Sequence, residues 1–180
     1  MSFVSDDSQQ TQQLRTMQII VIAMVGGAAV FTAIAIYTQT AGLFPPPAQP
    51  LLTYIAPAAS LVQLALLVLV PRLAVAAQRR RIAQTKWRLA DPDRYRPPFD
   101  ENGALWGLYQ NRLIIQLAFL EGACFFLLIA YMIEGTIACL MLALLFLCGM
   151  AVLFPLRERV ERWVEIQREL IAEERLGAGL

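Results

Sequence analysis

Four long stretches of the chain are apolar and almost free of charge, and they alternate with polar, basic segments. The stretches cover residues 17–37, 51–71, 113–133 and 136–155, and Glu121 is the one charged residue inside them. Each stretch has about the 20 apolar residues that a helix needs to cross a lipid bilayer. The pattern therefore predicts an all-α membrane protein with four transmembrane helices.

The composition supports a membrane location. Of the 180 residues, 58% are hydrophobic and 16% are charged, whereas soluble domains are usually about 45–50% apolar and about 25% charged. A net charge of +1 predicts no nucleic-acid partner, and the absence of His excludes imidazole-based catalysis and metal binding. The sequence shows no nucleophile–base pair, phosphate-binding loop, haem ligand pair or metal cluster. We therefore expect a protein that is not an enzyme and binds no cofactor or metal.

The basic residues are confined to certain connections. Nine of the 15 Lys and Arg residues lie in the segment 72–112 and five follow residue 155, whereas the loop 38–50 has no charge. Cytoplasmic loops of membrane proteins are enriched in Lys and Arg. We expect a multi-pass protein of the bacterial inner membrane whose termini and middle loop are all cytoplasmic.

The spans and connections divide the chain into five segments. They are a cytoplasmic N-terminal segment (1–16), a first transmembrane hairpin (17–71), a basic cytoplasmic helix and loop (72–112), a second transmembrane hairpin (113–155) and a cytoplasmic amphipathic helix (156–180). Pro71 and Pro155 are each expected to close a span. The tail helix carries mixed charges, which suits packing on another protein helix better than lying on anionic lipid. It would pack on the helix after Pro71, with its acids beside the arginines there, or self-associate.

The first and third spans share an internal repeat. At an offset of 95 positions, eight of 19 aligned residues are identical. The repeat places Ala23 and Gly27 on the first span, and Ala118 and Gly122 on the third, on stripes of residues four apart. Small residues at this spacing let membrane helices approach closely. We therefore expect two tandem helical hairpins whose first and third helices touch at these residues.

Glu121 is the candidate for a functional site. A carboxylate inside a transmembrane helix is costly, and it marks a site of function or specific pairing. Gln63 of the second span lies at a similar predicted depth and is the expected hydrogen-bond partner, with Ser60 one turn further out. Two interpretations are open at this point. Glu121 is either a protonated residue that holds helices together, or a group that binds and releases a proton or cation during transport.

The stretch Leu117–Ala123 resembles the carboxylate-bearing helix of the proteolipid subunits of rotary ATPases, some of which are duplicated hairpins. The resemblance covers about one span. It departs from the family because the proteolipid carboxylate lies on the second helix of a hairpin, whereas Glu121 lies on the first helix of the second hairpin. The whole chain is also similar to small uncharacterised four-span proteins of bacteria, a resemblance that implies no activity.

The cytoplasmic segments suggest how the protein acts. Arg79, Arg80 and Arg81 follow the second span and are expected to contact anionic lipid head groups and to fix the topology. The expected partners are the lipid bilayer and other membrane-protein subunits or a second copy of the chain. The sequence favours a non-catalytic scaffold or accessory subunit of a membrane assembly. The alternative is a small proton- or cation-coupled transporter or channel centred on Glu121.

Overall fold

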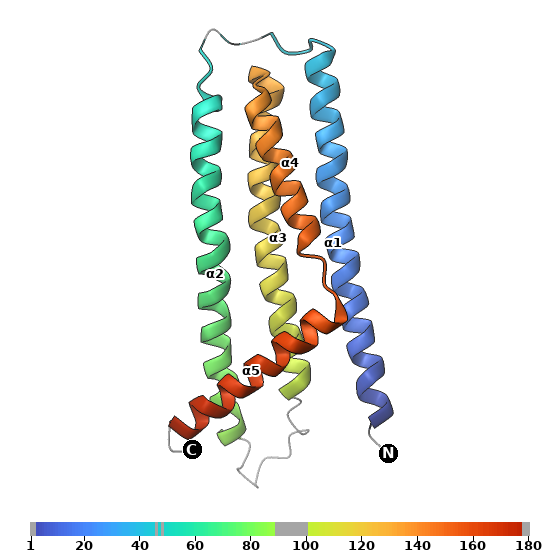
Figure 1. Ribbon diagram of the computed structural model, residues 1–180, viewed down its shortest axis with the longest axis vertical. Helices are drawn as coiled ribbons and strands as arrows, with labels where there is room; N and C mark the ends of the chain where they lie inside the picture. Colours follow the sequence, from blue (N-terminus) through green and yellow to red (C-terminus); the bar gives the residue numbers. More distant parts are fainter. Residues whose placement is uncertain (1–2, 46, 48, 89–100, 178–180) are drawn as a thin grey trace. The chain divides into compact units, whose positions relative to one another are not determined.

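The computed structural model describes residues 3–45, 47, 49–88 and 101–177, and in these ranges it contains five helices and no strand (Figure 1). The helices are α1 (Phe3–Thr40), α2 (Leu52–Arg88), α3 (Glu101–Glu134), α4 (Ile137–Val152) and α5 (Arg157–Gly177). The all-α class predicted from the sequence is confirmed. The loop predicted within the segment 72–112 falls on residues 89–100, which lie outside the described residues.

Three helices in the described ranges are long and apolar enough to cross a membrane by themselves. These candidate spans are Gln10–Thr40, Leu52–Ile82 and Glu101–Glu134. The helix α4 has 16 residues, or about 24 Å at 1.5 Å per residue, which is shorter than a hydrocarbon core of roughly 30 Å. It meets the length criterion only when it is counted together with α5. Three to four helices are therefore compatible with a membrane protein.

The helix α2 continues through Pro71, where the sequence predicted the end of a span. Proline inside a helix removes one backbone hydrogen bond and costs about 3 kcal/mol. The residues on both sides of Pro71 nevertheless stay helical. The break at Pro155 does occur as predicted, because α4 ends at Val152 and α5 begins at Arg157.

The chain forms two compact units, and each combines stretches that are distant in sequence. The charged unit comprises Met1–Met17, Pro71–Leu113 and Pro155–Leu180, and the apolar unit comprises Gln18–Val70 and Ile114–Phe154. All 15 Lys and Arg residues belong to the charged unit, whereas Glu121 and Glu134 are the charged residues of the apolar unit. Each boundary lies within one residue of a segment boundary drawn from the sequence.

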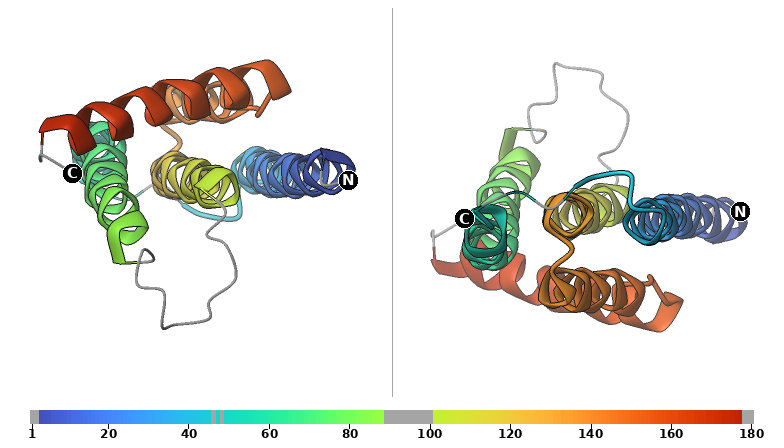
Figure 2. Two further views of the ribbon diagram at one scale, coloured as in Figure 1. Left: turned by 90° about the horizontal axis from the view of Figure 1, so that it is seen from below. Right: turned by 90° about the horizontal axis from the view of Figure 1, so that it is seen from above.

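In the apolar unit, α3 lies between α1 and α2, and α4 packs against α3 (Figure 2). Phe31 of α1 meets Phe125 of α3 edge to face, with ring centroids 5.0 Å apart. On the side of α4, the Cys124 thiol donates to the Ala143 carbonyl at 3.5 Å. The helices α1 and α2 are therefore consecutive in the chain but flank α3 in space. This arrangement differs from the predicted pair of tandem hairpins, in which α1 and α2 would pack on each other.

The turn between α3 and α4 requires a glycine. Gly135 has a φ of +69°, a left-handed conformation that costs other residues roughly 1–2 kcal/mol. Its N–H donates to the Tyr131 carbonyl at 2.8 Å and so closes the last turn of α3. A Cβ at this position would also collide with the side-chain amide of Gln39 on α1.

In the charged unit, one face of α5 is buried against the parts of α2 and α3 that belong to this unit. The buried residues of α5 are spaced four and three apart, as an amphipathic helix requires. They are Val160, Val164, Gln167 and Ile171. The residues between them are mostly exposed and charged, which agrees with the amphipathic pattern predicted for the tail.

The turn can be tested with Gly135→Ala. The left-handed backbone and the collision with Gln39 should together destabilise the protein by at least about 1–2 kcal/mol, and the thermal unfolding temperature in detergent should fall. Gly27→Ala is the matched control, because among the described atoms nothing lies within 4 Å of a Cβ at Gly27. Its unfolding temperature should equal or exceed that of the wild type, since Ala favours a helix more than Gly does. Equal unfolding temperatures for Gly135→Ala and wild type would contradict the turn.

Candidate functional site

Glu121 lies on α3 in the apolar unit and is half-buried. Gln63 of α2 approaches the neighbouring residue Gly122, and its Nε2 lies 3.6 Å from the place of a Cβ there. Within the described residues, however, the buried Oε1 of Gln63 has no hydrogen-bond partner. Ser60 donates its hydroxyl to the Ala56 carbonyl of its own helix at 2.8 Å. The structure therefore does not join the three predicted polar residues into a hydrogen-bonded cluster.

The small residues predicted at the contact between α1 and α3 lie elsewhere. Ala23, Gly27 and Ala118 are exposed, and Gly122 is half-buried beside α2. The physical reason is the helical period. Four residues turn a helix by about 400°, so a stripe of residues four apart drifts by about 40° at each step and leaves a straight contact face. The buried face of α1 in the apolar unit instead follows mixed spacings, through Val21, Ala28, Thr32 and Ala35.

The other acid of the apolar unit, Glu134, makes the hydrogen bonds that Glu121 lacks. Its Oε1 accepts a hydrogen bond from the backbone N–H of Leu52 at 2.6 Å. Its Oε2 accepts one from the Thr53 N–H at 2.5 Å and one from the Thr53 hydroxyl at 2.5 Å. The hydroxyls of Thr53 and Thr136 are 2.7 Å apart, so Thr136 donates to Thr53. This network links the end of α3 and the start of α4 to the first turn of α2.

The network is a helix cap supplied by another helix. The first N–H groups of a helix have no partner within it and carry partial positive charge, which a carboxylate compensates. The residue before α2 is Leu51, whose side chain has no acceptor to offer as a cap. This role of Glu134 is not predicted by the hydropathy or charge pattern. The available signal was a long helix without a local capping residue, together with an acid at the end of an apolar span.

A groove of about 590 Å³ opens in the apolar unit among α2, α3 and α4. Its lining is mainly leucine, and its two polar side chains are Ser60 and Gln116. Glu121 does not line it. The Ser60 hydroxyl is already bonded within its helix, so the groove suits an apolar occupant better than an ion.

The three arginines predicted to touch lipid head groups have different surroundings in the charged unit. Arg79 forms an ion pair with Glu174 of α5, with Nη2 and Oε1 2.7 Å apart. Arg80 and Arg81 are exposed. The pairing of Arg79 with an acid of α5 is one of the two arrangements expected for the tail helix, and it means that Arg79 serves helix packing.

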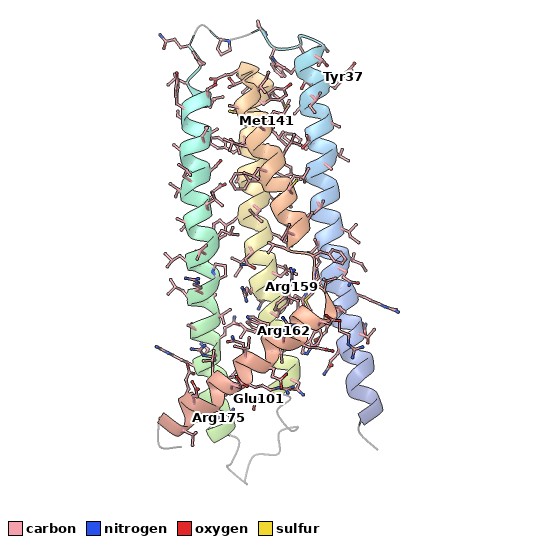
Figure 3. All side chains as sticks on the ribbon, viewed as in Figure 1. Tyr37, Glu101, Met141, Arg159, Arg162 and Arg175 are labelled. Atoms are coloured by element: carbon pink, nitrogen blue, oxygen red, sulfur yellow. The ribbon has the colours of Figure 1, made fainter. Side chains whose placement is uncertain are left out.

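Two further polar contacts hold α5 to the start of α3. Arg175 lies 3.2 Å from a carboxylate oxygen of Glu101 (Figure 3). Arg168 donates to the side-chain oxygen of Asn102. Partly exposed ion pairs usually contribute about 0–1 kcal/mol each, so these contacts orient α5 more than they stabilise it.

Within the described part of the chain, no group of three or more metal-ligating side chains lies close enough together to hold a metal ion. No family model matches the chain, and no curated protein or solved structure is significantly similar to it.

The helix cap can be tested with Glu134→Gln. A Gln side chain offers one acceptor oxygen, and its NH2 group would face a backbone N–H that it cannot bond. The loss should be about 0.5–2 kcal/mol, as for other cap substitutions. In detergent, hydrogen exchange at the amides of Leu52 and Thr53 should be faster in Glu134→Gln than in wild type. Glu121→Gln is the matched control and should leave this exchange unchanged. Equal exchange rates in Glu134→Gln and wild type would contradict the cap.

Proposed function

We propose that the protein is a multi-pass inner-membrane protein that acts as a non-catalytic scaffold or accessory subunit of a membrane assembly. The exposed surface of the apolar unit supports the membrane location. Large apolar side chains on it face outward, among them Tyr37 and Met141 (Figure 3). In α2, only 11% of the most apolar window is buried. Such a surface is unfavourable in water, whereas lipid tails or an apolar partner would cover it without penalty.

The observation that carries the scaffold proposal is the way α5 is held in the charged unit. Near its beginning, Trp163 packs edge to face on Tyr109 of α3 with ring centroids 5.2 Å apart. Near its end, Glu174 and Arg175 form ion pairs with α2 and α3. A helix fixed at two places keeps its outer face in one orientation, which is what a docking surface requires.

The outer face of α5 indicates the kind of partner. Its exposed residues include acids and bases in similar number, for example Glu158, Arg162, Glu165 and Glu169. A helix that lies on anionic lipid would carry mainly Lys and Arg. A mixed face instead suits a protein partner with complementary charges. We therefore propose that the outer face of α5 binds the cytoplasmic face of a partner subunit.

Topology gives the first test of this proposal. A reporter that is active only in the cytoplasm should be active when fused at residue 180 and inactive when inserted in the loop 38–50, because the basic segments favour the cytoplasm. The opposite pattern, with the tail outside, would overturn the proposed location of the charged unit.

The docking face gives the second test. The wild-type protein, purified in mild detergent, should carry a stoichiometric subunit that Glu165→Lys/Glu169→Lys loses, because charge reversal at an interface repels the matched partner. Arg15→Gln changes an exposed charge on α1 and should retain the subunit. The face would be excluded as the docking surface if the double variant and the control retained the same subunit equally.

The second candidate function is ion-coupled transport, and one observation favours it. Glu121 is a half-buried carboxyl, and in the described residues it does not form the bond to Gln63 on which a purely structural role would depend. Proton or sodium flux in reconstituted vesicles should then be present in wild type and absent in Glu121→Gln, which cannot ionise. Wild-type vesicles without flux under an imposed gradient would favour the scaffold.

A further inference from the structure

A second, smaller pocket lies wholly within the charged unit. It has a volume of about 280 Å³, is partly open to solvent and is lined by residues of α2, α3 and α5. Its polar lining consists of three arginines and a glutamine, with a tryptophan beside them. These residues are Arg72, Arg79, Arg112, Gln167 and Trp163. We propose that this pocket binds a phosphate group, carried either by the head group of an anionic phospholipid or by free phosphate.

The arginines of the pocket differ in whether a carboxylate compensates their charge. Arg79 is compensated by Glu174 at 2.7 Å. In the described residues, neither Arg72 nor Arg112 has a carboxylate within ion-pair distance. Two guanidinium groups without a carboxylate partner therefore line one pocket, and an anion between them would interact favourably with both. The planar fork of arginine matches phosphate oxygens with paired hydrogen bonds.

One of these two arginines, Arg112, is already held in place by an aromatic ring. The guanidinium carbon of Arg112 lies 5.6 Å from the centre of the Trp163 ring, and Tyr109 packs on the same ring. A cation–π contact holds the group through its planar face and leaves its N–H groups unused. Arg112 is therefore ordered before a ligand arrives and retains donors for phosphate oxygens.

Gln167 lines the same pocket and has an unsatisfied polar atom. Its side chain is 6% exposed, and within the described chain its Oε1 has no hydrogen-bond partner. A buried polar atom without a partner is rare and needs an explanation. A ligand that carries a hydroxyl or ammonium group next to its phosphate would supply the missing donor. Phospholipid head groups and protonated phosphate both have this chemistry.

The two sources of phosphate are distinguishable. The lipid source rests on the proposed membrane location of the protein, whereas the phosphate chemistry of the pocket does not. The full-length protein in neutral detergent is therefore the right sample, since it tests the pocket without relying on membrane orientation. The topology reporters described above fail or succeed independently of this result.

The test measures thermal unfolding during two titrations. One adds phosphatidylglycerol, with diacylglycerol of the same chains as the control that lacks phosphate. The other adds inorganic phosphate, with chloride at equal ionic strength as its control. A ligand that binds the folded state raises the unfolding temperature with its concentration. A response to phosphatidylglycerol alone identifies a lipid head group, and a response to inorganic phosphate as well identifies a general phosphate site.

The variants assign the response to the pocket. Arg72→Gln and Arg112→Gln should each weaken binding by about tenfold or more, as expected for the loss of a charge-assisted hydrogen bond. Arg162→Gln removes the same charge from an exposed position of α5 outside the pocket (Figure 3), and it should change binding less than about twofold. Because Arg72 is exposed, its replacement should fold even if that of Arg112 does not.

Two results would overturn the proposal. In the first, the wild-type protein responds to neither ligand beyond its control. In the second, Arg162→Gln weakens binding as much as Arg72→Gln does, which would show a general effect of net charge and no specific site.

Discussion

The hydrogen bonds from the first turn of α2 to the Glu134 carboxylate determine how the apolar unit is held together at one end. Only 11% of the most apolar window of α2 is buried, so packing alone gives this helix little orientation. Its orientation instead comes from the hydrogen bonds of 2.5 to 2.6 Å that two backbone N–H groups donate to the carboxylate. The adjacent Gly135 turns the chain so that Thr136 reaches the same network, and Gln39 of α1 packs on Gly135. The ends of four helices therefore depend on three consecutive residues.

The two acids of the apolar unit show that the depth of a carboxylate in a span does not predict whether it finds hydrogen-bond partners. The sequence drew attention to Glu121, since a carboxylate in the middle of an apolar helix is costly. The middle of a neighbouring helix offers no free backbone donor, because every N–H there is bonded within the helix. A helix start offers several. Glu134, at the end of α3, meets such a start, whereas Glu121 could be satisfied only by a side chain, and Gln63 does not bond to it in the described structure.

Hydropathy predicted the long apolar helices, because these depend on composition over windows of about 20 residues. The contact between α1 and α3 was expected and occurs at Phe31 and Phe125, but the position of α2 was not expected. Periodicity indicates which face of a helix is buried but does not name the partner, so α3 was not expected between α1 and α2 (Figure 2). The stripe through Gly27 failed because residues four apart drift by about 40° around the helix at each step and so leave a straight contact face. The cap by Glu134 joins residues 81 and 82 positions apart, beyond any local pattern.

The uneven placement of acids along α5 determines which arginines of the charged unit form ion pairs. The inward face of this helix is neutral through Val160, Val164 and Gln167. The first acid on this face is Glu174, which forms an ion pair with Arg79. The arginines that α2 and α3 direct toward the neutral part of α5 therefore find an aromatic ring and an amide where they would need a carboxylate. Charges in such a place are stable if solvent reaches them or if an anion joins them. A pocket among Arg72, Arg112 and Gln167 that is open to solvent or to an anion meets this requirement.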